Sequence, residues 1–251
     1  MKDRKQIMGT YKSISDWHHF RLRLFLEGIL TGIFAGLVIS LFRWGLTVAE
    51  EWRVDFYKEL VQKDWSATAL WFVALLFISA VLYKLTRIEP MAAGSGIPQV
   101  KGALLGLIKM RWFHIMWVKL TAGIIGIGAG LSLGREGPSI QLGAVAAQGV
   151  SRLLGRTRME ERYLMTSGAS AGLAAAFNAP LAGVIFALEE LHRNFSIMVL
   201  LPSMAAAMTA TVISRALFGR ETVFVFKDLQ LFPLQHYGII IIVALVAGLA
   251  G

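Results

Sequence analysis

The sequence contains no cysteine, and charged residues make up only 16% of its 251 positions. The absence of cysteine excludes disulfide bonds and thiolate metal sites, and the five histidines do not form a ligand set, so we expect no metal and no cofactor. Soluble proteins carry about 25% charged residues. The low charge content, with 56% hydrophobic residues and a mean hydropathy of +0.61, therefore predicts a multi-pass integral membrane protein in the lipid bilayer.

Acidic residues are also scarce, because 16 Asp and Glu face 25 Lys and Arg, which gives a formal net charge of +9. In a soluble protein this excess would suggest nucleic acid. Here the positive charges lie in short stretches between apolar runs, as the positive-inside rule describes for cytoplasmic loops. We therefore expect a cytoplasmic N-terminus and no nucleic-acid partner, and no cleavable signal is apparent.

Long apolar runs predict several membrane spans. Residues 1–23 are basic, with aromatic side chains between the charges, and indicate a cytoplasmic, interfacial lead-in. Residues 24–48 are the first expected span, residues 50–64 a mixed-charge loop on the far side, and residues 67–83 a second span. Further apolar segments follow at 116–133, 140–154, 164–177, 195–217 and from 237 onward, with an expected loop at 220–228.

Two helical stretches are too short to cross a bilayer. Residues 99–108 follow Gly94-Ser95-Gly96-Ile97-Pro98, and residues 181–188 are followed by Glu189-Glu190-Leu191-His192. A crossing takes about 20 helical residues, so these helices end part-way or leave on the side they entered. Short, Gly- and Pro-interrupted segments are typical of transporters with discontinuous helices. The predicted fold class is an all-α integral membrane bundle with broken, re-entrant helices.

The hexapeptide Gly134-Arg135-Glu136-Gly137-Pro138-Ser139 lies between two apolar segments. An unpaired carboxylate at membrane depth costs several kcal/mol, so Glu136 is a functional-site hypothesis. The glycines and the proline break one helix and start another, whose free amides form an anion site. The alternative is a turn outside the membrane in which Arg135 and Glu136 are simply solvated.

The two glycine-rich motifs, about 40 residues apart, resemble the first two signature motifs of the CLC family of chloride channels and chloride/proton exchangers. They are followed by a third matching stretch, Gly168-Ala169-Ser170-Ala171-Gly172-Leu173-Ala174-Ala175-Ala176-Phe177-Asn178-Ala179-Pro180-Leu181-Ala182-Gly183. The resemblance extends from about Phe20 to the last residue. It implies an all-helical homodimer in which each subunit has two inverted halves and its own anion pathway, in the inner (plasma) membrane of a prokaryote.

The resemblance also divides the chain. Residues 1–23 would be the cytoplasmic lead-in, residues 24–235 the first inverted repeat, and residues 236–251 the start of an incomplete second repeat. Because the sequence stops inside an apolar helix, we expect a fragment or a truncated product. Its partner would be the remaining C-terminal half of the transport domain, which holds further anion ligands. We expect no chloride flux from residues 1–251 alone.

The site residues are implied by the same motifs. Anion-binding positions would be Ser95, Gly96, Ile97, Arg135, Glu136 and Gly137. Ser95 would donate its hydroxyl to the central chloride, and its identity favours chloride over nitrate. Glu136 would be the gating glutamate that competes with chloride, and Arg135 would supply positive charge at the outer mouth.

Glu190 aligns with the inner proton-transfer glutamate of the family's exchangers, so protons would pass through Glu190 and Glu136. Glu189 fits a solvated helix end better, since adjacent helix positions point about 100° apart. Lys119, within a span, would raise the anion potential or, as we favour, satisfy a nearby backbone dipole. Lys101 would snorkel to the cytoplasmic surface.

Three functions follow from these residues. Chloride/proton antiport needs both Glu136 and Glu190 and is the one we favour. A passive voltage- or pH-gated chloride channel needs only the anion path. An enzyme embedded in the membrane is the third possibility, but no metal triad, nucleophile elbow or cofactor fingerprint is present, so we expect no catalytic residues.

Overall fold

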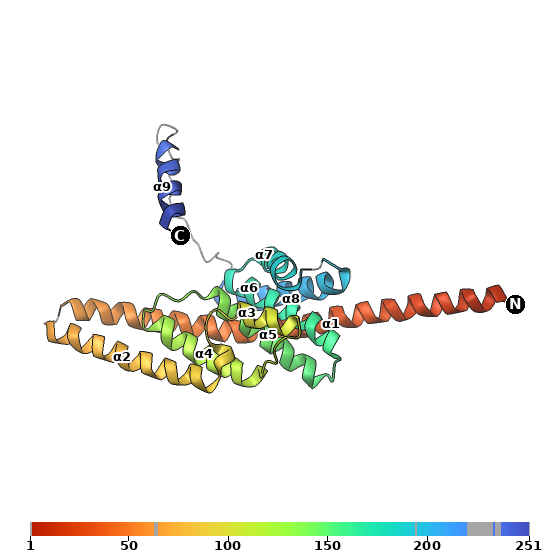
Figure 1. The fold of residues 1–251 in the computed structure, drawn as a ribbon, viewed down its shortest axis with the longest axis horizontal. Coiled ribbons are helices and arrows are strands. Elements are labelled where there is room, and N and C mark those ends of the chain that lie inside the picture. The colour runs from red at the N-terminus through yellow and green to blue at the C-terminus, as the bar shows by residue number, and fades with distance from the viewer. Residues whose placement is uncertain (1, 63–64, 194, 220–232, 234–236, 251) are drawn as a thin grey trace. The chain divides into compact units, whose positions relative to one another are not determined.

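The computed structural model describes residues 2–62, 65–193, 195–219, 233 and 237–250, with side chains in the first helix described from His19. The chain divides into two compact units, Met1–Arg220 and Glu221–Gly251. Within the described residues every regular element is a helix (Figure 1). The predicted loop at 220–228 and the predicted division between residues 235 and 236 lie outside the described residues.

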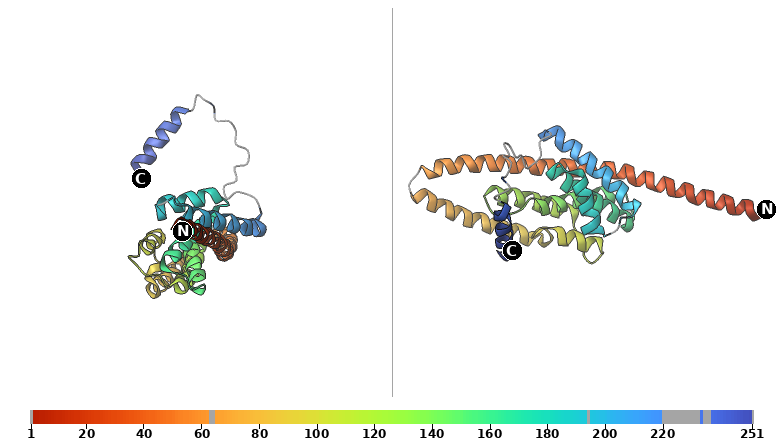
Figure 2. Two further views of the ribbon diagram at one scale, coloured as in Figure 1. Left: turned by 90° about the vertical axis from the view of Figure 1, so that its right-hand side faces the viewer. Right: turned by 90° about the horizontal axis from the view of Figure 1, so that it is seen from above.

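The first unit begins with two long helices. Helix α1 spans Lys2–Val61 and α2 spans Trp65–Ile88, and Figure 2 shows α1 running the length of this unit. Three described helices are long and apolar enough to cross a membrane, namely His19–Leu60 within α1, all of α2, and α8 at Ile197–Phe218. Because residues 23 and 24 lie inside one continuous helix, the proposed lead-in and first span have no break between them.

The prediction of a loop over residues 50–64 is wrong, because α1 continues to Val61. Ion pairs one turn apart, Glu50 with Arg53 and Asp55 with Lys58, support the helix here. Trp52 also stacks on the next aromatic ring along the same face, with ring centroids 5.4 Å apart. Mixed charge at such spacings is compatible with a solvated helix as well as with a loop.

The remaining elements of the first unit are shorter. They are a 3-10 turn at Pro90–Ala92, α3 at Ile97–Leu104, α4 at Trp112–Gly128, α5 at Glu136–Leu153, α6 at Arg158–Phe177, α7 at Pro180–Phe186 and a π-helical turn at Ala187–His192. The short helices α3 and α7 confirm the two predicted broken segments. In the second unit, α9 spans Tyr237–Ala250 and confirms the helix expected from residue 237.

Helices α5 and α6 form the centre of the first unit. Nearly all of α5 from Gly137 onward is buried, and so is most of α6 from Leu164 onward. Their backbones touch at Gly143, where an added Cβ would lie 2.9 Å from the Cα atom of Gly172. Small residues permit this close approach, which is how helices pack without a hydrophobic driving force in lipid. The buried α5 therefore has little freedom to move its first turn, where Glu136 lies.

Candidate anion and proton site

The first motif shapes the start of α3. Gly96 caps the helix with φ at +93°, a left-handed conformation that favours glycine, and Pro98 occupies the first turn. The Oγ atom of Ser95 accepts a hydrogen bond from the backbone N–H of Ile97 at 3.3 Å. Since a hydroxyl both donates and accepts, this bond leaves the O–H of Ser95 available to donate to an anion.

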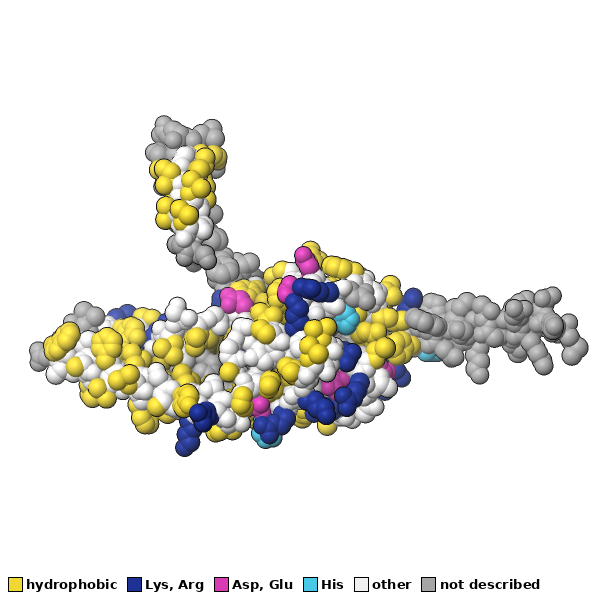
Figure 3. All heavy atoms as spheres, viewed as in Figure 1, with side chains coloured by type: hydrophobic (Ala, Val, Ile, Leu, Met, Phe, Trp, Pro, Cys, Tyr) yellow, Lys and Arg dark blue, Asp and Glu magenta, His cyan; other side chains and the backbone are white. Residues whose placement is uncertain are grey.

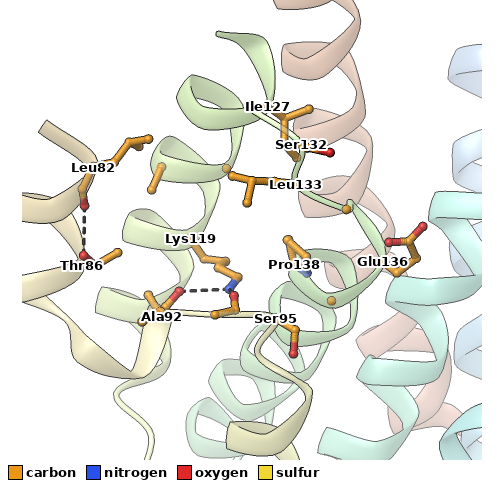
Figure 4. Close-up of a pocket in the computed structure, with 16 residues that line it drawn as sticks. Leu82, Thr86, Ala92, Ser95, Lys119, Ile127, Ser132, Leu133, Glu136 and Pro138 are labelled. Carbon is orange, nitrogen blue, oxygen red and sulfur yellow. Dashed lines mark hydrogen bonds between the residues drawn. The ribbon is translucent and has the colours of Figure 1, made fainter. Parts of the chain in front are cut away.

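Lys119 holds the loop in front of Ser95. It comes from α4, is only 5% exposed, and its Nζ donates to the carbonyl oxygens of Ala92 at 3.0 Å and Gly94 at 2.6 Å (Figure 4). The expectation that Lys119 satisfies backbone dipoles is therefore confirmed. A buried ammonium needs such partners, and in meeting them it ties α4 to the loop that presents Ser95.

The second motif forms the predicted helix break. Helix α4 ends at Gly128, and α5 begins at Glu136, with Pro138 third in the helix, where it removes no intrahelical hydrogen bond. The carbonyl oxygen of Arg135 accepts hydrogen bonds from the Ser139 amide at 3.1 Å and the Ser139 hydroxyl at 2.8 Å. Glu136 is exposed at the first helical position, beside amides that α5 itself leaves free.

The two motifs touch through Gly137 and Ser95. A Cβ atom added to Gly137 would lie 2.9 Å from both the carbonyl carbon and the Cβ of Ser95, so the residue at 137 has to be glycine for this approach. Ser95, Glu136 and Gly137 consequently line one cavity of about 440 Å³ between the loop, α4 and the start of α5. Figure 4 shows the Glu136 side chain directed away from Lys119.

Three of the predicted anion-site residues do not line this cavity. Gly96 and Ile97 adjoin it through Ser95. The Arg135 guanidinium instead lies over the ring of Phe177 at the end of α6, 5.6 Å from the ring centroid. The structure thus brings Ser95 next to the Glu136 motif and places the Arg135 charge to one side.

Glu190 lies in the π-helical turn after α7 and pairs with α3. Its Oε1 atom is 2.6 Å from the Nζ of Lys101, and the extension of Lys101 to the cytoplasmic surface stays a prediction. The hydrogen bond from Lys101, and then its positive charge, hold the pKa of the Glu190 carboxyl below its ordinary value. Ser95 therefore lies just before the first turn of α3, and Lys101, the partner of Glu190, lies about one turn into the same helix.

The pairing of Lys101 with Glu190 was missed at the level of sequence, since 89 positions separate the two residues. Their opposite charges on two short helices were the only available signal. The neighbouring Glu189 is exposed and has no ion-pair partner within the described part of the chain, as a solvated helix end would. No cluster of three metal-ligating side chains occurs among the described residues.

A family model, relatives of known name and solved structures all point to the same family. The family model described as voltage gated chloride channel matches residues 74–251. The H(+)/Cl(-) exchange transporter ClcA of Vibrio cholerae serotype O1 is 34% identical over 235 residues, which cover 91% of this chain and 49% of that relative. ClcA of Cronobacter sakazakii is 34% identical over 240 residues, covering 92% and 50%.

Two solved structures share the fold. A slow cyanobacterial Cl-/H+ antiporter superposes with a TM-score of 0.77 at 31% identity, over 91% of this chain and 54% of the other. A CLC-type fluoride/proton antiporter gives a TM-score of 0.68 at 25% identity, over 91% and 55%. The chain thus spans about half the length of the relatives it matches. With the family model matching more than half of its residues, this membrane-embedded helical chain belongs to the voltage-gated chloride channel (CLC) family.

Proposed function

We propose that the protein containing this chain exchanges chloride for protons through a glutamate-gated anion pathway. The observation that carries the proposal is the arrangement around α3. The start of α3 presents Ser95 to the cavity of Glu136, and its next turn pairs with Glu190. An antiporter needs an anion site and a proton path that meet, and one short helix touches both. The relatives are named as exchange transporters, which supports transport over catalysis.

The chemistry rests on one carboxylate that serves two ions. Ionised Glu136 competes with chloride for the free amides at the start of α5, because both are anions attracted to the same helix terminus. Protonation removes that attraction, so the side chain leaves and chloride enters. Chloride and proton movement are coupled because the proton that makes the Glu136 side chain leave the anion site is itself one of the transported protons. Glu190 supplies that proton from the cytoplasmic side.

Several properties of the whole protein belong to this proposal. It would act as a homodimer in the inner (plasma) membrane of a prokaryote, with its N-terminus in the cytoplasm. Further anion ligands would come from the remaining C-terminal half of the transport domain. Residues 24–235 would be the first inverted repeat. Chloride is the substrate, and the protein needs no cofactor.

A passive chloride channel is the second candidate. A channel would use the cavity of Ser95 and Glu136 and would leave Glu190 without a role. The hydrogen-bonded contact between Glu190 and Lys101 on α3 favours the antiporter, because it joins the carboxylate to the helix that carries the anion motif.

The test is a flux assay on the full-length protein reconstituted in liposomes. Glu136→Gln imitates the protonated carboxyl permanently, so chloride flux should lose its pH dependence from about pH 4 to 8, and proton transport should stop. Glu51→Gln, the same change at an exposed carboxylate on α1, is the control and should behave as wild type. A Glu136→Gln variant that keeps steep acid activation would contradict the gate assignment and would support the solvated turn.

A further inference from the structure

A second cavity, of about 290 Å³, lies between the α3–α4 connection, the end of α5 and the start of α6. Four cationic side chains line it, from three places in the chain: Lys109, Arg152, Arg158 and Arg162. Figure 3 shows Lys and Arg side chains gathered next to hydrophobic ones on one face of the molecule. None of the residues discussed for transport lines this cavity.

The cavity has a large excess of positive charge. Its one carboxylate, Glu161, accepts a hydrogen bond from Gln148 Nε2 at 2.7 Å and lies 3.7 Å from Arg152 Nε, so Arg152 and Glu161 largely neutralise each other. The described residues offer Lys109, Arg158 and Arg162 no ion-pair partner. Three unpaired cations around one small cavity repel one another unless an anion lies among them.

The positive-inside rule does not account for this arrangement. That rule explains why Lys and Arg are on one side of the membrane, but not why side chains 53 positions apart, Lys109 and Arg162, line one hollow. The Arg162 guanidinium also lies against Gly106 in the α3–α4 connection, because a Cβ atom added to Gly106 would collide with its Nη2 atom. The convergence therefore indicates a binding site.

Apolar and exposed residues lie next in sequence to lining residues of the cavity, and we call them the apolar rim: Leu105, Leu107, Leu153 and Met159. Leu107 is 77% exposed and Leu153 is 78% exposed. Exposed leucines next to unpaired cations suit the boundary between lipid tails and headgroups, where apolar side chains enter the acyl region and cations meet phosphates. A water-soluble anion would not require the apolar rim.

We propose that this cavity binds the phosphate of an anionic phospholipid, with Lys109, Arg158 and Arg162 as its ligands and the exposed leucines in contact with the acyl chains. Basic pockets between membrane helices are known to take such headgroups. The bound lipid would join the α3–α4 connection to the start of α6. The site does not depend on the direction or the coupling of transport.

The experiment is native mass spectrometry of the protein in its natural length, in detergent, titrated with phosphatidylglycerol or with zwitterionic phosphatidylcholine. We expect a clear preference for phosphatidylglycerol. The double variant Lys109→Gln/Arg158→Gln removes two exposed cations and breaks no side-chain hydrogen bond among the described residues, and its affinity should fall roughly ten- to thirtyfold. The matched control is Lys84→Gln/Arg87→Gln, with the same charge change at the end of α2, and should bind as wild type.

Competition with inorganic phosphate tests whether the cavity binds a lipid headgroup or a free phosphate ion. Inorganic phosphate should not displace phosphatidylglycerol, because it cannot contact the leucine rim. If it does displace the lipid, and the cavity variant also loses phosphate binding, the phosphate ligands are supported and the lipid source is wrong. Equal phosphatidylglycerol affinity in wild type, cavity variant and control would overturn the site. Thermal unfolding without lipid, expected to be equal for both double variants, excludes misfolding as the cause of any loss.

Discussion

The Nζ atom of Lys101 lies 2.6 Å from Oε1 of Glu190, so the helix that begins behind Ser95 is ion-paired to the proposed proton donor. Both side chains are partly exposed, at 27% for Lys101 and 46% for Glu190. A pair of this kind is accessible to water on one side and connected to the anion motif on the other. That position suits a group that takes up protons from solvent and passes them inward.

Replacing Glu190 should separate proton from chloride movement. Glu190→Gln keeps the shape of the side chain but cannot carry a proton, so chloride-driven proton uptake into liposomes should stop while chloride flux continues. Glu189→Gln, one residue away and exposed, is the matched control and should leave both fluxes unchanged. Proton uptake that survives Glu190→Gln would favour the channel.

Replacing Lys101 should shift the pH dependence of coupling. Lys101 lowers the pKa of Glu190, so the carboxyl stays ionised to a lower pH in the native protein than it would alone. Lys101→Gln removes both the hydrogen bond and the charge, so the pKa of Glu190 should rise towards its ordinary value. The acid limb of coupled proton flux should then move to higher pH. An unmoved limb would show that another group limits proton entry.

Ser95 should contribute a single hydrogen bond to chloride. A hydroxyl donated to a charged partner contributes about 1.5–3 kcal/mol, so Ser95→Ala should weaken chloride binding by roughly ten- to a hundredfold in isothermal titration. Ser79→Ala removes an exposed hydroxyl on α2 that bonds only its own helix, and it should leave the affinity unchanged. Unchanged affinity in Ser95→Ala would assign the anion to the backbone amides.

Gly137 should tolerate no side chain. In Gly137→Ala the new methyl group would lie 2.9 Å from the Ser95 carbonyl carbon, so one of the two motifs has to shift. We expect a loss of roughly 1–3 kcal/mol in the free energy of unfolding, measured in mixed micelles, and weaker chloride binding. Gly238→Ala, where an added Cβ meets nothing within 4 Å, should change stability by less than about 0.5 kcal/mol. If both variants were equally stable, Gly137 and Ser95 would have to lie further apart than this structure shows.

The sequence by itself determined the membrane class, the two helix breaks and the identity of the groups placed at them. These features rest on local chemistry. Proline and glycine decide where a helix starts within a few residues, as at Gly96 and Pro98 before α3 and at Pro138 in α5. The runs of apolar residues likewise predict helices whatever other segments pack against them. The continuation of α1 through residues 50–61 was missed because mixed charge is equally common in loops and solvated helices.

Only the tertiary structure decided which of these local features meet. The contact of Gly137 with Ser95, the bonds from Lys119 to the loop, and the pair of Lys101 with Glu190 all join segments 25 or more residues apart. The same holds for the cavity lined by Lys109 and Arg162. Such contacts depend on the close packing of α5 against α6 and on the angles at which short helices leave the break, and no local periodicity encodes those angles.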